Sequence, residues 1–395
     1  MRVEIGAGLA NKVSEILKDF PQNFLVVGDK NTLAAANLQL AKDVHCYENC
    51  TEANIVQVKE LEGLLANYDG VLAVGSGSVC DICRLASFNA KKEFAVFATA
   101  PSMDGFASGS APIIFGNFKR SVLAHAPSII IGDTDILSAA PDALKAAGFG
   151  DIIAKYVALV DWQIADLISN NPAEAYDLEA ASLVKGALEK SIANPNSAHA
   201  MMEALVQSGI AMAMVKHTRP ASGAEHLLAH FWEIKKIEKG QPVAFHGAKV
   251  GVGTLMIVRL YHNIAAGKYG EPIFQKDAPN WDNIHTVYGD AFASDLESVN
   301  NPSVLDTTNL QILQKKWPDI VNLIHKQLPT YEKFLNLMQE AKCITNIKGI
   351  DIDRQLALDA VEFHPYMRHR INLTRLIPML GLRPNYGEIV DEHCL

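Results

Sequence analysis

The sequence predicts an α/β protein with a parallel-sheet domain at the N-terminus and an all-α domain at the C-terminus. Short apolar runs alternate with helical patterns between residues 24 and 131, which is typical of a parallel sheet covered by helices on both faces. From Asp135 onward, long helical patterns dominate and β-like runs almost vanish. The chain has 395 residues, which is more than one ordinary core accommodates. We therefore expect one domain over residues 1–140 and a second over residues 141–395.

The strands of the first domain are predicted from short apolar runs that end in Gly, Asp or small hydroxylic residues. The expected strands are 24–27, 44–47, 71–74, 94–98 and 128–131. Helical stretches such as 53–66 and 78–88 lie between them. Segment 103–123 interrupts this alternation, and we expect a hairpin or a strand extension over the sheet edge there.

The second domain is expected to consist mainly of long helices. Helical patterns run over 151–168, 173–192, 198–216, 248–266, 308–327 and 354–366. No internal repeat or low-complexity linker is visible in the sequence. We therefore expect the two domains to join tightly, with a cleft between them where ligand sites often lie.

Composition and charge exclude several classes of protein. Hydrophobic residues make up 49% of the chain and charged residues 20%, which supports a large core and argues against disorder. The formal net charge of −9 lacks the basic footprint of a nucleic-acid-binding protein, so no nucleic-acid partner is expected. Six cysteines in a chain of this length are not a disulfide framework. Without an apolar signal region at the start or a run of roughly 18 apolar residues, we expect a cytoplasmic protein without membrane insertion.

A glycine turn follows one expected strand and opens the next helix. It consists of Gly75, Ser76, Gly77 and Ser78. Glycines let the backbone approach a phosphate closely, and the N–H groups of a helix N-terminus bind the anion. The turn matches neither G-x-G-x-x-G nor G-K-[ST]. A plain strand-to-helix turn, with Ser78 and Asp81 as a capping box, is the alternative, and both interpretations can hold together.

A second candidate loop, 99–108, follows the strand 94–98 and reads TAPSMDGFAS. Small hydroxylic residues, an aspartate and glycines at the carboxyl end of a strand are typical of a ligand crevice in an α/β sheet. A surface turn is the alternative interpretation.

Three histidines and one aspartate are candidates for a metal site. His226 and His230 are four residues apart in a helical run, which places both on one helix face. His246 opens the next helical run, and Asp151 falls where another long helix is expected to begin. Asp151 is interpreted either as an N-cap or as a metal ligand beside His226 and His246. One carboxylate and two imidazoles leave open coordination positions and suit Zn²⁺, Ni²⁺, Fe²⁺ or Mn²⁺.

Taken in order, these motifs resemble the iron-containing (group III) alcohol dehydrogenase superfamily, and within it the sn-glycerol-1-phosphate dehydrogenase branch of the AraM type. The matching stretches lie between residues 71 and 254 and read VGSGSVCD, TAPSMDGFAS, AGFGDIIAKYVALVDW, TRPASGAEHLLAHFWE and AFHGAKVGVGT. The resemblance implies a Rossmann-like, dinucleotide-binding first domain and a helical, metal- and substrate-binding second domain, as in dehydroquinate synthase-like and group III alcohol dehydrogenase folds. A homodimer is expected by the same analogy.

The resemblance also implies a role for each matching position. The residues expected to bind NAD or NADP are Asp29, Gly75, Ser76, Gly77, Ser78, Asp81, Thr99, Ser102 and Ser108. The expected ligands of one divalent ion (zinc, nickel or iron) are Asp151, His226 and His246. The substrate is expected to meet Asp104, Asp151 and His230, with Asp104 and His230 as catalytic residues. A carboxylate at Asp29 repels a 2′-phosphate, which favours NAD over NADP.

The implied reaction is the NAD(P)-dependent, metal-assisted interconversion of dihydroxyacetone phosphate and sn-glycerol 1-phosphate. The phosphate of such a substrate needs a cation, and the candidates near the motifs are Lys155, Lys216, Arg219 and Lys249. Arg84 stands where the superfamily usually has lysine, and Ser76 replaces the middle glycine of its commoner G-G-G-S turn. The alternatives are a glycerol or other polyol dehydrogenase, a metal-dependent lyase or hydrolase on the same scaffold, and a non-catalytic binding protein.

Overall fold

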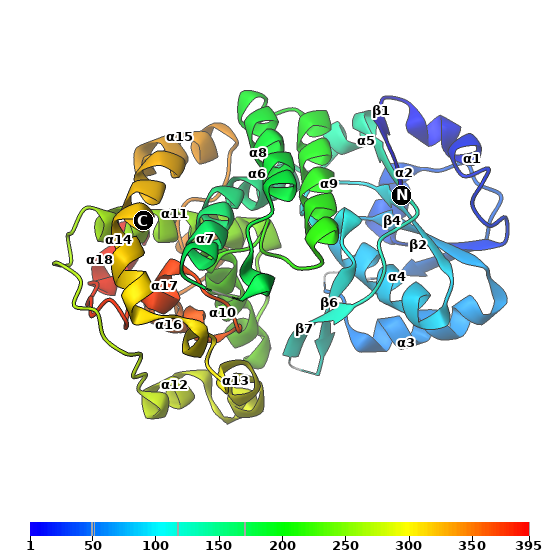
Figure 1. The fold of residues 1–395 in the computed structure, drawn as a ribbon. Coiled ribbons are helices and arrows are strands. Elements are labelled where there is room, and N and C mark those ends of the chain that lie inside the picture. Colours follow the sequence, from blue (N-terminus) through cyan, green and yellow to red (C-terminus); the bar gives the residue numbers. More distant parts are fainter. Residues whose placement is uncertain (49, 51, 117, 170, 395) are drawn as a thin grey trace. The chain divides into compact units, whose positions relative to one another are not determined.

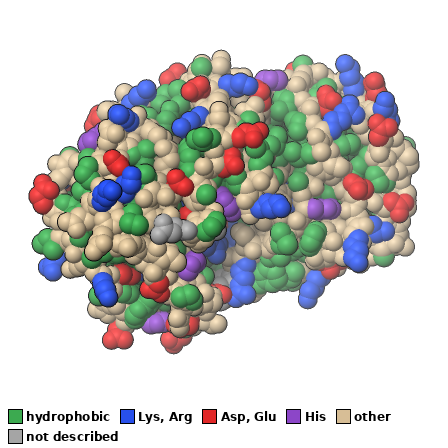
Figure 2. Space-filling model, viewed as in Figure 1, with side chains coloured by type: hydrophobic (Ala, Val, Ile, Leu, Met, Phe, Trp, Pro, Cys, Tyr) green, Lys and Arg blue, Asp and Glu red, His purple; other side chains and the backbone are tan. Residues whose placement is uncertain are grey.

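A computed structural model describes residues 1–48, 50, 52–116, 118–169 and 171–394. The chain forms two compact units (Figure 1). The first contains Met1–Ile152 and Ser182–His217, and the second contains Ile153–Ala181 and Thr218–Leu395. These bounds differ from the expected division after residue 140 in two ways. The first unit extends to Ile152, and the segment Ser182–His217 from the middle of the chain also belongs to it. Basic and acidic side chains are intermixed on the face of the molecule drawn in Figure 2.

The first unit contains a sheet of six parallel strands. They are β1 (Arg2–Gly6), β2 (Phe24–Asp29), β3 (Val44–Tyr47), β4 (Gly70–Gly75), β5 (Glu93–Ala98) and β8 (Ile129–Asp133), in the order β1-β8-β5-β4-β2-β3. The five predicted strands are therefore confirmed. The sixth, β1, was missed because its sequence, RVEIG, alternates charged and apolar residues and contains no apolar run. It lies at the sheet edge, where its side chains stay partly exposed and only β8 pairs with it.

Both faces of this sheet are buried. Leu25, Val27, Val71 and Ala73 belong to one apolar cluster, whereas their neighbours along the same strands belong to another. Helices α3 (Ile55–Leu64) and α4 (Gly77–Ala90) contribute to the first cluster, and α1 (Val13–Ile16) and α2 (Lys30–Ala36) contribute to the second. Each fully buried Val, Leu or Ile side chain stabilises such a core by about 1.5–3 kcal/mol. Continuous apolar runs, rather than alternating ones, are the sequence pattern that two buried faces require.

The strand order reverses beside β2, and this reversal positions the candidate cofactor residues. β2 pairs with β3 on one side and with β4 on the other, where Gly28 lies opposite Val74. β4 in turn pairs with β5, where Gly75 lies opposite Ala98. The carboxyl ends of three neighbouring strands therefore meet at one edge. In open α/β sheets, ligands bind outside the carboxyl ends of the strands at such a switch point.

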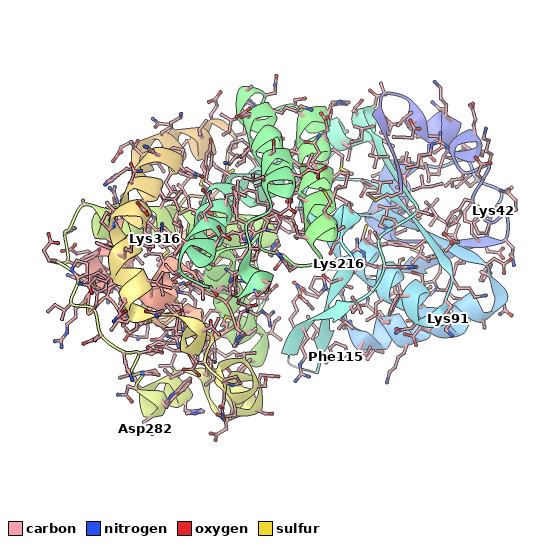
Figure 3. All side chains as sticks on the ribbon, viewed as in Figure 1. Lys42, Lys91, Phe115, Lys216, Asp282 and Lys316 are labelled. Carbon is pink, nitrogen blue, oxygen red and sulfur yellow. The ribbon has the colours of Figure 1, made fainter. Side chains whose placement is uncertain are left out.

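The segment predicted as a hairpin or strand extension is a hairpin. Strands β6 (Ser110–Phe115) and β7 (Phe118–Leu123) form a separate antiparallel pair, and Figure 3 marks Phe115 near its tip. The Ile114 amide donates to the Ala53 carbonyl at 2.9 Å, which ties the hairpin to the segment before α3.

Helices α5 (Thr134–Ala139), α6 (Asp142–Ile153) and α9 (Ala198–Val215), with most of α8 (Leu178–Ala193), complete the first unit. α9 is long and apolar enough to cross a membrane by length and composition, but 56% of it is buried inside the protein. It packs against β1, α5 and the short 3-10 helix Gly105–Ala107. Lys216, labelled in Figure 3, caps the C-terminal end of α9.

The second unit is helical in the part of the chain that the structure describes. Its longer helices are α7 (Lys155–Ile168), α10 (Ala224–Glu238), α11 (His246–Ala265), α12 (Trp281–Tyr288), α13 (Ala293–Asn300), α14 (Leu310–Gln327), α15 (Tyr331–Glu340) and α16 (Arg354–Phe363). The short helices α17 (Leu373–Leu376) and α18 (Tyr386–Glu392) follow. The prediction of a single helix over 151–168 is wrong in one respect. Ala154 separates the end of α6 from the start of α7.

Candidate active site

The glycine turn between β4 and α4 lacks the predicted capping box. The helix begins at Gly77, and the side chain of its N-cap residue, Ser76, makes no capping hydrogen bond. Ser78 therefore lies inside the helix, and Asp81 instead pairs with Arg84, with 2.7 Å between Oδ1 and a guanidinium nitrogen. The Ser76 side chain therefore does not cap the first turn of α4, where an anion-binding turn presents its backbone N–H groups.

Gly75 is required for packing rather than for a special backbone angle. A Cβ at this position would lie 2.8 Å from the Cβ of Val79 on the first turn of α4. The glycine thus lets the helix start close against the strand, which is one of the uses of glycine in dinucleotide-binding turns.

Several predicted cofactor residues lie together at the sheet edge. The Ser102 hydroxyl donates to the Ser76 hydroxyl at 3.1 Å, and the Thr99 amide donates to the Gly75 carbonyl at 3.1 Å. Asp29, at the end of the neighbouring strand β2, caps α2, and Oδ1 accepts both capping bonds. Its Oδ2 is the oxygen that would meet a ribose hydroxyl. The cofactor roles of these residues stay predictions.

Ser108 and Asp81 serve the local structure of the same region. The Ser108 hydroxyl bonds with the carbonyl of Ser110 at 3.1 Å and shapes the turn into β6. Asp81 is buried, and this burial raises the pKa of its carboxyl group to about 6 although Arg84 favours the charged form.

Arg84 connects α4 to the loop that carries Asp104. Its buried guanidinium donates to the carbonyls of Gly105 at 2.5 Å, Phe106 at 3.1 Å and Ser110 at 3.2 Å. A planar fork with several donors makes these contacts at once, whereas a lysine ammonium is a compact point charge on a flexible chain. Arginine therefore suits this position, where the resemblance implies a lysine, because it makes all of these contacts.

Helices α6 and α9 hold the Asp104 loop by close contact. A Cβ on Gly148 of α6 would lie 1.9 Å from the Pro101 carbonyl oxygen, and one on Gly209 of α9 would lie 2.9 Å from the Asp104 carbonyl oxygen. The buried Ser208 hydroxyl donates to Asp104 Oδ2 at 3.0 Å. Ser208 and Gly209 were missed in the sequence, where their only signal is a pair of small residues inside an apolar helix.

Asp151 lies in the last turn of α6 and is fully buried. The N-cap interpretation is therefore wrong, because the helix begins at Asp142. Asp151 Oδ2 accepts a hydrogen bond from the Asp104 amide at 3.0 Å, so the structure brings these two predicted residues together. Asp151 belongs to the first unit and lies two residues before Ile153, where the second unit begins.

The three histidines converge within the second unit. His226 and His230 lie one turn apart on α10, and His246 is the first residue of α11. The ring centroids are 6.2 Å apart for the pair on α10, 5.4 Å for His226 and His246, and 5.6 Å for His230 and His246. The four-residue spacing and the helix start at His246 were both predicted, and both are confirmed.

His226 has the orientation of a metal ligand. Its Nδ1 lies 2.7 Å from Oε1 of the buried Glu225. A carboxylate on Nδ1 fixes the tautomer in which that nitrogen donates, and Nε2 then keeps its lone pair for a metal. The donor set therefore fits a divalent cation bound by imidazole nitrogen.

His246 also belongs to a second group of possible metal ligands, which differs from the expected set of Asp151, His226 and His246. His230, Glu233 and His246 have ligand atoms within 4.8 Å of one another. Both oxygens of Glu233 are already engaged, Oε2 with His230 Nδ1 at 3.1 Å and Oε1 with the Lys249 ammonium at 3.1 Å. A carboxylate neutralised by a buried lysine is a poor ligand for a cation. Burial lowers the pKa of His230, and the bond to Glu233 opposes this effect.

The four basic residues predicted near the motifs are mostly committed to the fold. Lys249 is buried in the ion pair with Glu233, and Arg219 pairs with Glu174 and donates to the Ile371 carbonyl. Lys155 is fully buried at the first position of α7. Lys216 caps α9 in the first unit.

A buried carboxyl group that the sequence did not reveal supports the start of α10. Asp161 accepts hydrogen bonds from the Ala224 amide at 2.8 Å, the Tyr261 hydroxyl at 2.6 Å and the Leu373 amide at 3.1 Å. Burial raises the pKa of Asp161 to about 7. This residue joins α7, α10, α11 and the first residue of α17, so it holds the histidine-bearing helices in place.

Residues 4–141 match the family model described as iron-containing alcohol dehydrogenase. A glycerol-1-phosphate dehydrogenase (NAD(P)+) of Geobacillus thermodenitrificans (strain NG80-2) is 35% identical over 300 residues, which cover 70% of this chain and 74% of the relative. The enzyme of the same name from Methanosarcina mazei is 34% identical over 278 residues, which cover 66% of this chain and 76% of the relative.

Solved structures share the fold at low sequence identity. A probable glycerol dehydrogenase from Sinorhizobium meliloti 1021 superimposes with a TM-score of 0.63 at 13% identity, over 99% of this chain and 95% of the other. Glycerol dehydrogenase from Schizosaccharomyces pombe gives a TM-score of 0.58 at 16% identity, over 99% of this chain and 87% of the other. Together with the close curated relatives, these matches confirm the predicted fold and family. The chain therefore belongs to the iron-containing alcohol dehydrogenase family, among its glycerol-1-phosphate dehydrogenases.

Proposed function

We propose that this protein is an NAD(P)-dependent, divalent-metal-dependent dehydrogenase that interconverts dihydroxyacetone phosphate and sn-glycerol 1-phosphate. The convergence of three imidazoles on two neighbouring helices, with His226 held by a buried carboxylate, is the observation that carries the proposal. The relatives named glycerol-1-phosphate dehydrogenase support the choice of substrate.

The nucleotide would bind at the switch point of the sheet. The turn from Gly75 to Ser78 would receive the pyrophosphate, and Ser76, Thr99 and Ser102 lie together beside it. Asp29 ends the neighbouring strand, where its carboxylate would bind ribose hydroxyls and would repel a 2′-phosphate. We therefore expect NADH to be preferred over NADPH.

The metal would be held by His226, His246 and Asp151. Asp151 lies in α6, whose last residue, Ile153, is already the first residue of the second unit, so the chain itself keeps this carboxylate near that unit. When bound, such a cation polarises a ketone oxygen, and a reduced nicotinamide supplies hydride. Zinc, nickel and iron all suit this donor set.

The protein's own residues would orient the substrate and manage the proton. His230 is held through Nδ1 by Glu233, so its Nε2 can face a substrate oxygen and exchange a proton with it. Asp104 is fixed by Ser208 and by the contact with Asp151, and it would position a substrate hydroxyl group. A homodimer and a cytoplasmic location belong to the same proposal.

The test is a spectrophotometric assay of NADH and NADPH oxidation with dihydroxyacetone phosphate, with dihydroxyacetone as the matched substrate without phosphate. The proposal expects turnover of the phosphorylated ketone, chiefly with NADH. Turnover of dihydroxyacetone alone would favour a polyol dehydrogenase. Failure with both ketones and both nucleotides, in metal-loaded protein, would contradict the proposal.

A further inference from the structure

We propose that Lys249 closes a second metal site and thereby directs the divalent cation to the set of ligands that contains His226. The second site consists of His230, Glu233 and His246, whose ligand atoms all lie within 4.8 Å of one another. His246 belongs to both sets, so the two sets compete for one imidazole. The inference rests on the proposed function, which assigns the ion to the set with His226.

Two packed helices of the second unit build this ligand group with the same spacing. On α10, Glu233 follows His230 by three residues, and on α11, Lys249 follows His246 by three residues. Residues three apart lie on one face of a helix. The two helices pack against each other, so the carboxylate meets the ammonium where the two imidazoles also approach.

The contact between Glu233 and His230 has a length that suits two ligands of one ion. Glu233 Oε2 lies 3.1 Å from His230 Nδ1, and the ring centroids of His230 and His246 are 5.6 Å apart. Bonds of about 2.0–2.1 Å to a tetrahedral zinc ion place neighbouring ligand atoms about 3.3 Å apart. A cation could therefore take the place of the proton that His230 and Glu233 share.

The Lys249 ammonium supplies the positive charge that a metal at this place would otherwise supply. It lies 3.1 Å from Glu233 Oε1, and both side chains are only 2% exposed. Water therefore screens the pair little, and the ammonium would repel a divalent cation bound to the other oxygen of the same carboxylate. A buried carboxylate needs a cationic partner, and Lys249 already fills that need.

The carboxylate beside His226 has different partners. Glu225 Oε1 contacts His226 Nδ1 at 2.7 Å and accepts a hydrogen bond from the Gly223 amide at 2.7 Å. Oε2 of Glu225 is buried and has no hydrogen-bond donor among the described residues. An amide orients this carboxylate without adding a positive charge, so Glu225 can strengthen the binding of a cation by His226. The same helix thus carries one imidazole beside a metal-supporting carboxylate and one whose carboxylate Lys249 occupies.

Keeping the cation away from His230 also preserves the role of this imidazole in the proposed reaction. Metal binding requires a deprotonated ring nitrogen, so an ion on His230 would compete with the proton that the ring exchanges with a substrate oxygen. Lys249 is therefore a positioning residue, which acts through Glu233 and needs no contact with the substrate.

The test asks whether removal of the ammonium opens the second site, and it measures zinc affinity by competition with a chromophoric chelator. His226→Ala should bind zinc weakly, because the first set has lost a ligand. Adding Lys249→Met should strengthen zinc binding by at least about 10-fold, because a unit charge close to the ion is removed. Adding Glu233→Gln to this double variant should abolish the gain. Lys236→Met, which removes another buried lysine of α10, paired with Asp351, is the matched control and should restore nothing.

The outcomes separate this inference from the proposed function. Where His226→Ala loses zinc, the absence of a gain with Lys249→Met would overturn the inference alone. A gain that persists after Glu233→Gln would also overturn it, because the ion would then lie elsewhere. Wild-type zinc affinity in His226→Ala would instead overturn the ligand set of the proposed function, and this inference with it.

Thermal unfolding keeps the test decisive if the loss of Lys249 destabilises the protein. Zinc should then raise the Tm of the double variant, because a ligand that binds the folded state stabilises it, and should leave the Tm of the triple variant with Glu233→Gln unchanged. A double variant whose Tm does not respond to zinc would contradict the inference.

Discussion

At the scale of single residues, two glutamates determine what the histidines of α10 can do. Glu225 precedes His226 and contacts its Nδ1 at 2.7 Å, whereas Glu233 follows His230 by three residues and contacts its Nδ1 at 3.1 Å. Both contacts direct the opposite ring nitrogen away from the glutamate. Glu233 is neutralised by Lys249, and Glu225 instead accepts the Gly223 amide at 2.7 Å. The two histidines thus have different partners, which suits one for a metal and the other for a proton.

Replacing Glu225 with glutamine should weaken metal binding by about 10- to 100-fold, which is the usual cost of losing an outer partner of a ligating histidine. The expected cause is the loss of a carboxylate that orients the His226 ring. The measurement is competition with a chromophoric chelator. Glu340→Gln, at an exposed position in the same unit, should bind metal like wild type. Wild-type affinity in Glu225→Gln would show that Glu225 does not orient a ligand.

At the scale of elements, the Asp104 loop is held by two helices that are distant in sequence. Gly148 of α6 and Gly209 of α9 let the loop backbone approach, and Arg84 of α4 binds its carbonyls. The positions of these glycines could not be predicted, because a glycine in a helical pattern gives no sign of the backbone it will contact. The predicted strands, in contrast, follow from apolar runs that any parallel sheet with two buried faces requires.

The boundaries of helices and strands were also hard to predict where long-range contacts determine them. Asp151 was expected at a helix start because GFGD resembles a loop followed by an N-cap, yet α6 runs through both glycines. Packing against the Pro101 backbone explains why Gly148 is tolerated inside a helix, and that contact is long-range. Strand β1 gave no apolar run, since its edge position leaves it half-exposed.

Replacing Ser208 with alanine should lower kcat/KM for dihydroxyacetone phosphate by about 5- to 30-fold, because Asp104 loses a buried donor worth about 1–2 kcal/mol. Metal content should not change. Ser191→Ala is the matched control, since Ser191 is also fully buried in the first unit but donates only within its own helix, to the Ala187 carbonyl. Equal losses in the two variants would mean that Ser208 acts through stability alone.

At the scale of the whole molecule, the late part of the chain supports the helix that carries His226 and His230. The segment from His364 to Thr374 packs on α10 and anchors through Asp161. None of this could be predicted, because the sequence beyond residue 270 has only helical periodicity and its contacts are set by the fold. The metal and cofactor residues could be proposed because they cluster in short motifs.

Acidification should destabilise the second unit through His364. Burial lowers the pKa of His364 to about 4, so the folded state keeps it neutral while the unfolded state binds a proton below about 6.5. The contribution of neutral His364 to the free energy of unfolding is complete above about pH 6.5 and is lost as the pH falls toward 4. Asp161 acts in the opposite direction, because a raised pKa favours the folded state at lower pH.

Replacing His364 with glutamine should therefore flatten the fall of Tm between about pH 6.5 and pH 4, even if the variant starts from a lower Tm. Thermal unfolding across this range measures the slope. His369→Gln, at an exposed position of the same segment, should keep the wild-type slope. An unchanged slope in His364→Gln would show that His364 does not carry the pH dependence.

The central claim is that a divalent cation bound by His226, His246 and Asp151 is required for reduction of a phosphorylated ketone. The most direct measurement follows NADH oxidation with dihydroxyacetone phosphate as chelated protein is titrated with zinc, nickel or iron, while bound metal is counted on the same samples. We predict that activity returns in proportion to one bound ion per chain, and that His246→Ala neither binds this ion nor regains activity while it unfolds like wild type. Full activity in metal-free protein, or in His246→Ala, would contradict the account.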